Sequence, residues 1–503
     1  MAVTTAPASG SRGGLAKAGL IGLAGSIING AAAFGVVVAI TRGLDSTAAS
    51  GAVFTTMAVF NIAFIVCTLG AEVAVVRAVA RNDTNERSIV NAALWPSLAF
   101  SIVVAVALAA ARGTIASAIG GEHHNDLTAA LLVAVPFIPF ATATSVLTAV
   151  TRGRGTMMPT VMIERISRPS TQLILLGFAA VLDAGPTITT LAWTVTFGIA
   201  ALPAAAWFAK TKPVGDDRNH AHVAPNYWRF AAPQALTTVF QVLLRWADIV
   251  LVAALTDTAT AAVYTAASRM LLTGNFLNLA IVQSISPMIS NALARGASDE
   301  ASDLLKTGTG WLVAAVWPGY LLLIVFGGVA LDLFGAGYAV GGTALAILAA
   351  AMLIASAVGP IEAVLLMSGG SLTSLGNNAA AVLVNVVANV VLVPKMGIEG
   401  AAIAWALGLL ITNIAPLIQV RQRLGFDPSG RGLTVAATVA VITVLLPSLV
   451  IRQVLDVGLL DLVIVAAVTG ALHVVVLSRS RAVLHLDELV GALRSGNRQS
   501  KAS

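Results

Sequence analysis

The chain has 503 residues, of which 57% are hydrophobic and only 10% are charged, and its formal net charge is +6 at pH 7. Soluble domains carry about 25% charged residues, so this composition, with a mean hydropathy of +0.90, excludes a soluble globular protein and predicts an all-α protein that crosses a membrane many times. The positive charge follows the predicted membrane topology and does not indicate a nucleic-acid partner, and the single cysteine, Cys67, excludes a disulfide framework.

The chain begins with a Gly-, Ser- and Ala-rich stretch, residues 1–14, that we expect to be disordered and cytoplasmic. The apolar run that follows is too long for the core of a signal peptide and has no evident cleavage site, so no cleavable signal is expected. Fourteen hydrophobic segments are predicted, each long enough to cross a bilayer, which takes about 20 residues of helix. The segments span residues 15–41, 48–72, 88–111, 127–150, 157–182, 187–209, 227–255, 260–290, 304–331, 338–367, 372–393, 399–420, 432–452 and 457–477.

The lysine and arginine residues of the connecting loops predict the orientation. An even number of segments puts both termini on one side of the membrane. If that side is the cytoplasm, 21 Lys and Arg face inward and four face outward, as the positive-inside rule requires. The longest loop, 210–226, is then cytoplasmic and too short for a folded soluble domain, and the tail 478–503 also lies in the cytoplasm.

Two halves of the chain repeat each other. Trp95-Pro96 is matched by Trp317-Pro318 within similar apolar runs, and DSTAASGAVFT from Asp45 is matched by DTATAAVYT from Asp257. Six segments separate the matched stretches, so both copies have the same orientation in the membrane, and the substrate site is expected between them. The predicted organisation is a six-helix lobe at 15–209, a linker at 210–226, a second six-helix lobe at 227–423 and two extra helices at 432–477.

The most informative stretch is a helical hairpin from Tyr227 to Ser290 with its turn at Asp257. The first arm is apolar enough to span the bilayer, yet polar residues recur along it at steps of four, three, four and three, which places them on one helical face. They are Gln234, Thr238, Gln241, Arg245 and Asp248. The second arm carries Arg269, Asn275, Asn278 and Gln283.

Arg245 and Arg269 are each twelve residues from Asp257, which places both about 18 Å from the turn, near the bilayer middle, at roughly 1.5 Å per residue. A charge that faces lipid at that depth costs about 3 kcal/mol or more, so we expect both guanidinium groups to face a polar chamber between the lobes. The alternative is a structural ion pair between Arg245 and Asp248, three residues apart. Arg269 has no acidic residue at a spacing of three or four, which favours the chamber.

Two further arginines, Arg165 and Arg168, share a face of the fifth segment with Gln172. They either line the same chamber or reach back to the phosphates of membrane lipids, and the spacing does not separate these alternatives. Arg42, at the outer end of the first segment, is expected to be an interfacial anchor.

Acidic residues inside the segments are candidates for coupling transport to H⁺ or Na⁺, because burial shifts a carboxyl group toward its protonated form. The candidates are Glu72, Glu164, Asp248 and Glu362. The alternative is an ion pair between or along helices, such as one from Glu164 to Arg168.

No nucleotide-binding loop, metal-ligand cluster or nucleophile–base arrangement is evident in the sequence. His123 and His124 lie in a predicted outer loop beside Glu122 and Asp126, where we expect a solvated surface rather than a metal site. The sequence therefore predicts no catalytic residue, no metal and no cofactor.

Four motifs carry a resemblance to a known family: LGAEVAVVRAVAR at 69–81, YTAASRM at 264–270, LFGAGY at 333–338 and LVPKMGIEGAAIA at 392–404. Their order and spacing resemble the multidrug/oligosaccharidyl-lipid/polysaccharide (MOP) exporter superfamily, and within it the lipid-linked oligosaccharide flippases and polysaccharide transporters. The resemblance implies two six-helix lobes arranged in a V, alternating access, and a cationic cavity for a lipid phosphate or pyrophosphate. The fourteen segments resemble the flippase branches, and the absence of a carboxylate from the first segment disfavours a cation-coupled drug exporter.

These observations predict a non-enzymatic flippase that moves a polyprenyl-(pyro)phosphate-linked saccharide across the cytoplasmic membrane of a bacterium for cell-envelope assembly. Membrane lipids and envelope glycosyltransferases are the expected partners, and H⁺, Na⁺ or the membrane potential is the expected driving force. A multidrug exporter of the same fold and a non-transporting membrane scaffold are the alternatives. The predicted substrate-binding residues are Arg245, Arg269, Arg165, Arg168, Gln241, Gln234 and Asn278, and the predicted ion-coupling residues are Asp248, Glu72 and Glu362.

Overall fold

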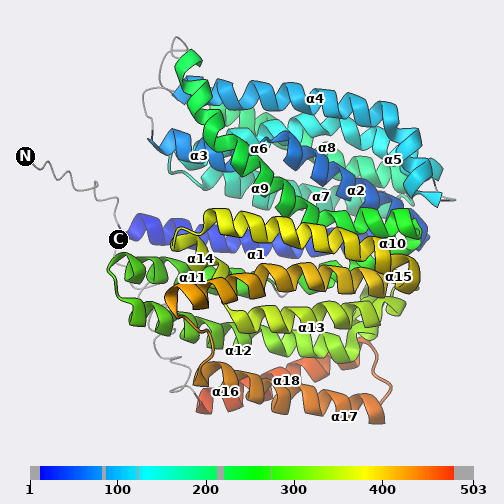
Figure 1. The fold of residues 1–503 in the computed structure, drawn as a ribbon. Helices are drawn as coiled ribbons and strands as arrows, with labels where there is room; N and C mark the ends of the chain where they lie inside the picture. The colour runs from blue at the N-terminus through cyan, green and yellow to red at the C-terminus, as the bar shows by residue number, and fades with distance from the viewer. Residues whose placement is uncertain (1–11, 82–85, 122–123, 212–219, 273–274, 481–503) are drawn as a thin grey trace, which may run out of the picture.

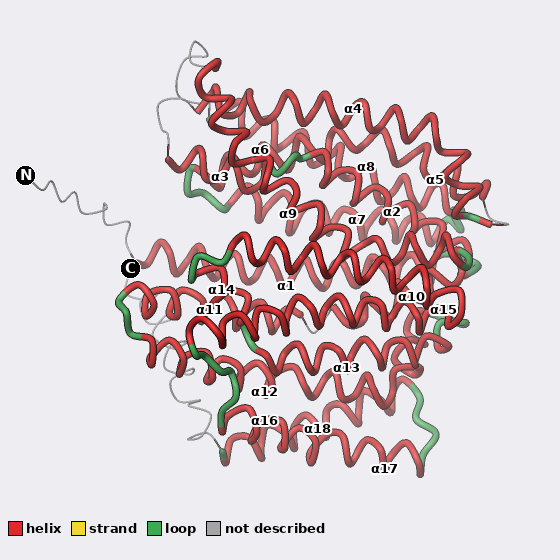
Figure 2. The backbone as a smooth tube through the Cα atoms, in the orientation of Figure 1, coloured by secondary structure: helices red, strands yellow, loops and turns green. Residues whose placement is uncertain are grey.

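The computed structural model describes residues 12–81, 86–121, 124–211, 220–272 and 275–480, and for 12–27, 220–223, 272, 275–280, 283, 284 and 287 it describes the backbone only. Within these ranges the chain is almost entirely helical and contains no β-strand (Figure 2). Ten of the described helices are long and apolar enough to cross a membrane. The predicted all-α, membrane-spanning fold is therefore confirmed, whereas the number fourteen stays a prediction.

The N-terminal group of helices fills the upper part of Figure 1, with α1 running along its lower edge. Helix α1 begins at Arg12, so the last three residues of the stretch that we expected to be disordered are helical. The group comprises α1 (Arg12–Gly43), α2 (Thr47–Cys67), α3 (Ala71–Arg81), α4 (Glu86–Ile119), α5 (His124–Ala134), η2 (Val135–Phe137), α6 (Ile138–Gly153), the π-helical segment η3 (Thr160–Ser167), α7 (Arg168–Val181) and α8 (Pro186–Lys210).

Most of the C-terminal group fills the lower part of Figure 1, whereas its first helix, α9, runs through the upper part, and its last helices, α16 to α18, lie at the edge farthest from α4. Its first helix begins at His220, so the end of the predicted linker is helical. The group comprises α9 (His220–Leu255), α10 (Thr258–Leu272), α11 (Asn275–Ala294), α12 (Ser298–Leu331), η5 (Asp332–Phe334), η6 (Ala339–Gly341), α13 (Gly342–Val358), α14 (Ile361–Met367), α15 (Ser371–Leu424), α16 (Arg431–Ala440), η7 (Val441–Leu445), α17 (Leu446–Val454) and α18 (Leu459–Arg479).

Helix α15 is a hairpin rather than one straight rod. Its 54 residues would extend about 80 Å as a single helix, far more than the roughly 30 Å of a bilayer core. At Gly397 the backbone leaves the helical region, with φ 58° and ψ −133°, a conformation that glycine adopts without a steric penalty. The arms are cross-linked by two amide hydrogen bonds between Asn377 and Gln419, of 2.8 and 2.9 Å. The break predicted between the segments 372–393 and 399–420 is therefore confirmed.

Helix α9 joins the two groups. It packs against α2, α3 and α4 of the N-terminal group and against α10 and α15 of the C-terminal group. The guanidinium of Arg77 on α3 lies 4.0 Å from the ring centroid of Phe230 on α9. At the other end of α9, Asp257 starts α10 by accepting the backbone N–H of Thr260 at 2.7 Å, which confirms the predicted turn.

The two groups meet closely at the end of the bundle that holds the Asp257 turn, which the topology predicts to be the outer end. A Cβ atom at Gly51 of α2 would lie 1.8 Å from the carbonyl oxygen of Thr258 on α10, so only glycine allows this approach. Arg42 at the end of α1 donates from Nη2 to the Asp332 carbonyl at 2.7 Å and from Nε to the Leu333 carbonyl at 2.9 Å. We call the meeting of Arg42 and Gly51 with Thr258 and residues 332–334 the outer contact.

The helices after α15 pack against α12. His473 of α18 is buried and lies with Nε2 3.0 Å from the Ala314 carbonyl and Nδ1 3.1 Å from the Thr443 hydroxyl, so it joins α12, η7 and α18. Both ring nitrogens are used in these contacts, which makes His473 a structural residue.

Candidate functional site

The polar face predicted on α9 is divided by the tertiary structure. Gln234 is half-buried, whereas Gln241 and Arg245 are exposed at the surface of the isolated chain. Asp248, one turn further along α9, is 3% exposed. One helical stripe therefore supplies an accessible cation and a buried carboxylate. The side chain of Asn278, the remaining candidate on this hairpin, lies outside the described residues.

Arg269 of α10 stacks on an aromatic ring of α9. Its guanidinium carbon lies 4.0 Å from the ring centroid of Trp246. The charges of Arg245 and Arg269 interact, so the hairpin brings the two guanidinium groups near each other. Among the described residues, Nη2 of Arg269 is buried without a hydrogen-bond partner. Neither arginine takes part in any of the ion pairs recorded for the described residues.

Asp248 turns away from Arg245 toward α10 and α15. It accepts the hydroxyl of Tyr264 at 3.1 Å and the side-chain amide of Asn389 at 2.9 Å. Asn389 is itself fully buried, and its Oδ1 has no partner among the described residues, which leaves an oxygen acceptor beside the carboxylate. The structural ion pair between Arg245 and Asp248, the alternative weighed above, is not the arrangement observed.

The acidic candidates of the N-terminal group lie around α6. Ser145 donates to Oε1 of Glu72 at 2.6 Å, and Thr148, one turn later on α6, donates to Oε1 of Glu164 at 2.5 Å. The charge of Glu164 also interacts with that of Arg168.

The two arginine candidates of the fifth predicted segment thus lie in a separate polar group. The guanidinium of Arg168 lies 4.7 Å from the ring centroid of Phe197 on α8, and Arg165 is half-buried in η3. Segments η3 and α7 pack against α1, α6 and α8. Their neighbour Gln172 donates to the Trp193 carbonyl at 3.4 Å.

Glu362, the third ion-coupling candidate, is half-buried in α14 and accepts the hydroxyl of Ser374 at 3.1 Å. No group of three or more His, Cys, Asp or Glu suited to a metal ion occurs among the described residues. Glu122 and His123 lie outside them, and His124 places Nδ1 3.2 Å from the Gly121 carbonyl.

Comparison with known proteins assigns the chain to a family. A family model described as "Polysaccharide biosynthesis protein" matches residues 15–293. The chain belongs to this family. No curated protein sequence matches the chain significantly.

Solved structures share the fold of this polysaccharide biosynthesis family member. The lipid II flippase MurJ in an inward closed conformation has a TM-score of 0.73 at 13% identity, over 90% of this chain and 97% of that chain. An inward-facing multidrug resistance MATE family transporter of the MOP superfamily has a TM-score of 0.67 at 16% identity, over 78% and 94%. A MOP superfamily transporter from Pyrococcus furiosus has a TM-score of 0.61 at 15% identity, over 82% and 96%. The resemblance to the MOP superfamily is confirmed.

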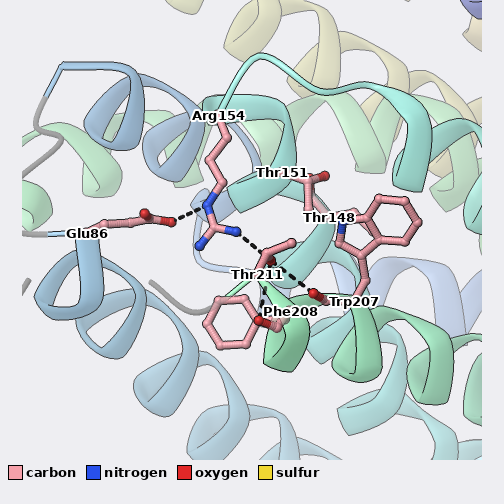
Figure 3. A network of polar contacts seen from close by, with 7 residues as sticks. All are labelled: Glu86, Thr148, Thr151, Arg154, Trp207, Phe208 and Thr211. Carbon is pink, nitrogen blue, oxygen red and sulfur yellow. Dashed lines mark hydrogen bonds and ion pairs between the residues drawn. The ribbon is translucent and has the colours of Figure 1, made fainter. Parts of the chain in front are cut away.

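This family member also holds a polar network at the opposite end of the N-terminal group from Arg42. Figure 3 shows Arg154, in the loop after α6, pointing between Glu86 of α4 and Thr211 after α8. Its Nε donates to Glu86 at 2.6 Å and its Nη1 to the Thr211 hydroxyl at 2.6 Å (Figure 3). The network fastens three helix ends together, so Arg154 is a structural arginine.

Sequence reasoning missed the neutral partners of the charged residues: Tyr264, Asn389, Trp246, Ser145 and Thr148. The sequence did hold a signal for Asn389. A polar residue recurs on α15 at steps of four, seven and four, which marks one buried polar stripe: Ser374, Asn378, Asn385 and Asn389. Trp246 carried no such signal, since a single aromatic residue in an apolar segment is usually part of the core.

Proposed function

We propose that this protein is a flippase of the bacterial cytoplasmic membrane that carries a polyprenyl-(pyro)phosphate-linked saccharide to the outer leaflet for cell-envelope assembly, with both termini in the cytoplasm. The observation that supports this proposal is the pair of Arg245 and Arg269 on facing helices, with no acidic partner among the described residues. Membership of the polysaccharide biosynthesis family points to the same substrate class.

The chemistry of the substrate requires such a pair. Sugar hydroxyls lose their hydrogen bonds to water in hydrocarbon, at a cost of about 1–3 kcal/mol each when unpaired, so a transporter must supply a polar path. The phosphate needs fixed cations, and the planar fork of arginine binds two phosphate oxygens at once. Gln234 and Gln241 on the same arm offer amide groups for sugar hydroxyls, and Asn278, Arg165 and Arg168 remain candidate ligands.

Transport is tested by replacing both arginines. Arg245→Ala combined with Arg269→Ala is expected to stop translocation while the protein still folds and inserts. Arg229→Ala, which removes an exposed arginine from the same helix, serves as the control and is expected to transport normally. Depletion of the protein, followed by mass spectrometry of lipid-linked saccharides held on the cytoplasmic leaflet, identifies the substrate and reports transport. Normal flipping by an inserted double variant would refute the site.

The rival functions give different results in the same cells. A multidrug exporter of this fold would change drug resistance on depletion without accumulation of any lipid-linked saccharide. A scaffold for glycosyltransferases would tolerate the loss of both arginines. Accumulation on depletion, reproduced by the double variant, excludes both.

We further propose Asp248 as the residue that couples transport to H⁺ or Na⁺. A buried carboxylate bounded by a phenol, an amide and the unpaired Oδ1 of Asn389 offers oxygen ligands to a hard cation or a site for a proton. Na⁺-dependent or pH-dependent thermal stabilisation of the purified protein that Asp248→Asn abolishes would support this role. Stabilisation that persists in Asp248→Asn would contradict it, and Glu72 and Glu362 would then be the next candidates.

A further inference from the structure

Two side-chain contacts join helices α9 and α10. In one the charged residue belongs to α9, and in the other it belongs to α10. From α9, Asp248 accepts the hydroxyl of Tyr264 on α10. From α10, Arg269 lies over the ring of Trp246 on α9. The two contacts lie within one turn of each other on α9, so they fix the same part of the hairpin.

The contact between Arg269 and Trp246 offsets the repulsion between two like charges. Arg245 is next to Trp246 in the chain, and its charge repels that of Arg269. A cation over the face of an indole ring gains about 0.5–2 kcal/mol, and tryptophan is the most effective aromatic residue in this role. Trp246 is half-buried, which limits the screening of this attraction by solvent. The ring therefore holds Arg269 where the neighbouring charge would otherwise push it away.

A ring also leaves the arginine free to bind a ligand, which an acidic partner would not. The N–H donors of a guanidinium lie in its plane, and an aromatic ring contacts its face. Arg154 differs in that Glu86 and Thr211 take up its Nε and Nη1, although its Nη2, like that of Arg269, is buried without a partner among the described residues. Arg269 takes part in none of the ion pairs recorded for the described residues, and its Nη2 has no hydrogen-bond partner among them.

We propose that Trp246 is a positioning residue for the substrate: its ring holds Arg269 beside Arg245 so that both guanidinium groups bind one pyrophosphate or phosphate group. The proposal rests on the proposed function and deepens it, because it states how two like charges are kept together before the anion arrives. The Asp248–Tyr264 contact keeps the two helices in the register that this arrangement needs.

Binding of farnesyl pyrophosphate to the purified full chain in nanodiscs tests the proposal, with farnesol as the matched ligand without phosphate. We expect Trp246→Leu to weaken binding of farnesyl pyrophosphate by about 2- to 30-fold, the range of a cation–ring contact, and to leave binding of farnesol unchanged. Trp246→Phe keeps a ring face and is expected to restore most of the affinity. Trp405→Leu, which removes another half-buried tryptophan packed against the same core, is the control and should leave the preference for the pyrophosphate unchanged.

A double-mutant cycle separates positioning from general damage. In an Arg269→Ala background, Trp246→Leu is expected to cause no further loss, because the ring then has no cation to hold. Additive losses, or an unchanged affinity in Trp246→Leu, would overturn the proposal while the proposed function stands. A wild-type chain that binds farnesyl pyrophosphate no better than farnesol would overturn both. If Trp246→Leu does not fold, Trp246→Phe and Arg269→Ala decide the matter, since positioning requires a far smaller loss in the first than in the second.

Discussion

Arginine is used in contrasting ways at the outer contact and in the middle of the α9–α10 hairpin. Arg42 donates from Nε and Nη2 to the backbone carbonyls of Leu333 and Asp332 in η5, the short helix that follows α12. The guanidinium of Arg269 lies over the ring of Trp246, and its Nη2 has no hydrogen-bond partner among the described residues. A satisfied arginine holds two elements together, whereas an arginine with an unpaired donor keeps the capacity that the proposed anion binding needs.

The same contrast separates the two copies of the internal repeat. Phe54 and Tyr264 occupy matching places in the two repeated motifs, and both are almost fully buried. Only Tyr264 has a hydroxyl, and it binds Asp248. The C-terminal copy thus holds a carboxylate among neutral groups, whereas in the N-terminal group the charge of Glu164 interacts with that of Arg168. The two halves therefore share a helical pattern and differ in the groups that surround their acidic residues.

Breaking the outer contact at Gly51 is expected to have the largest effect. Gly51→Ala places a methyl group against the Thr258 carbonyl, so α2 and α10 must separate, at a cost of about 3 kcal/mol. Thermal unfolding in detergent measures the loss. Gly113→Ala is the control, because nothing lies within 4 Å of its Cβ position, and it is expected to be neutral or slightly stabilising. Equal melting temperatures for the two variants would show that the close approach at Gly51 does not matter.

The buried carboxylate of the hairpin comes next. Asp248→Ala leaves the Tyr264 hydroxyl and the Asn389 amide without their acceptor, which costs about 2 kcal/mol. Asp248→Asn retains an acceptor and is expected to lose less than half as much. Chemical or thermal unfolding of both variants compares them. An alanine variant as stable as the asparagine variant contradicts this account.

Removing the guanidinium from the outer contact is expected to have a smaller effect. Arg42→Ala loses two hydrogen bonds at a partly exposed site, worth about 1 kcal/mol in total. The outer end should then open more often. The rate at which a membrane-impermeant maleimide labels Ser50→Cys, in a Cys67→Ala background, measures this opening, because Ser50 is fully buried. Arg42→Lys is expected to label at an intermediate rate, and an unchanged rate in Arg42→Ala would remove Arg42 from the contact.

The smallest effect on stability is expected at Arg245, which sharpens the contrast with Arg42. Arg245 is exposed and takes part in none of the ion pairs recorded for the described residues, so Arg245→Lys should leave the melting temperature unchanged. Binding of farnesyl pyrophosphate should still weaken, because lysine lacks the two-pronged geometry of arginine. A lower melting temperature with unaltered binding would mean that Arg245 is structural.

Much of the fold followed from the sequence because the bilayer restricts what a chain can do. In hydrocarbon every backbone group needs an internal partner, so apolar stretches must be helical. The same logic located the Asp257 turn and the reversal at Gly397, where a short polar or glycine-containing motif separates two apolar runs. The equal spacing of Arg245 and Arg269 from the turn was also sufficient to predict that the two residues lie at matching depth, since rise per residue sets depth.

Only the tertiary structure decided which partner each polar side chain has. Periodicity places Asp248 on a face of α9, yet the choice of Tyr264 and Asn389 over Arg245 depends on how α9, α10 and α15 pack, and Asn389 is 141 residues away in the chain. Arg42 was expected to be an interfacial anchor, and it donates to carbonyls 290 and 291 residues distant in the chain. The physical reason is range: helical periodicity and membrane insertion act over a few turns of one segment, whereas hydrogen bonds and ring contacts require atoms within a few ångströms, which only the packed bundle brings together.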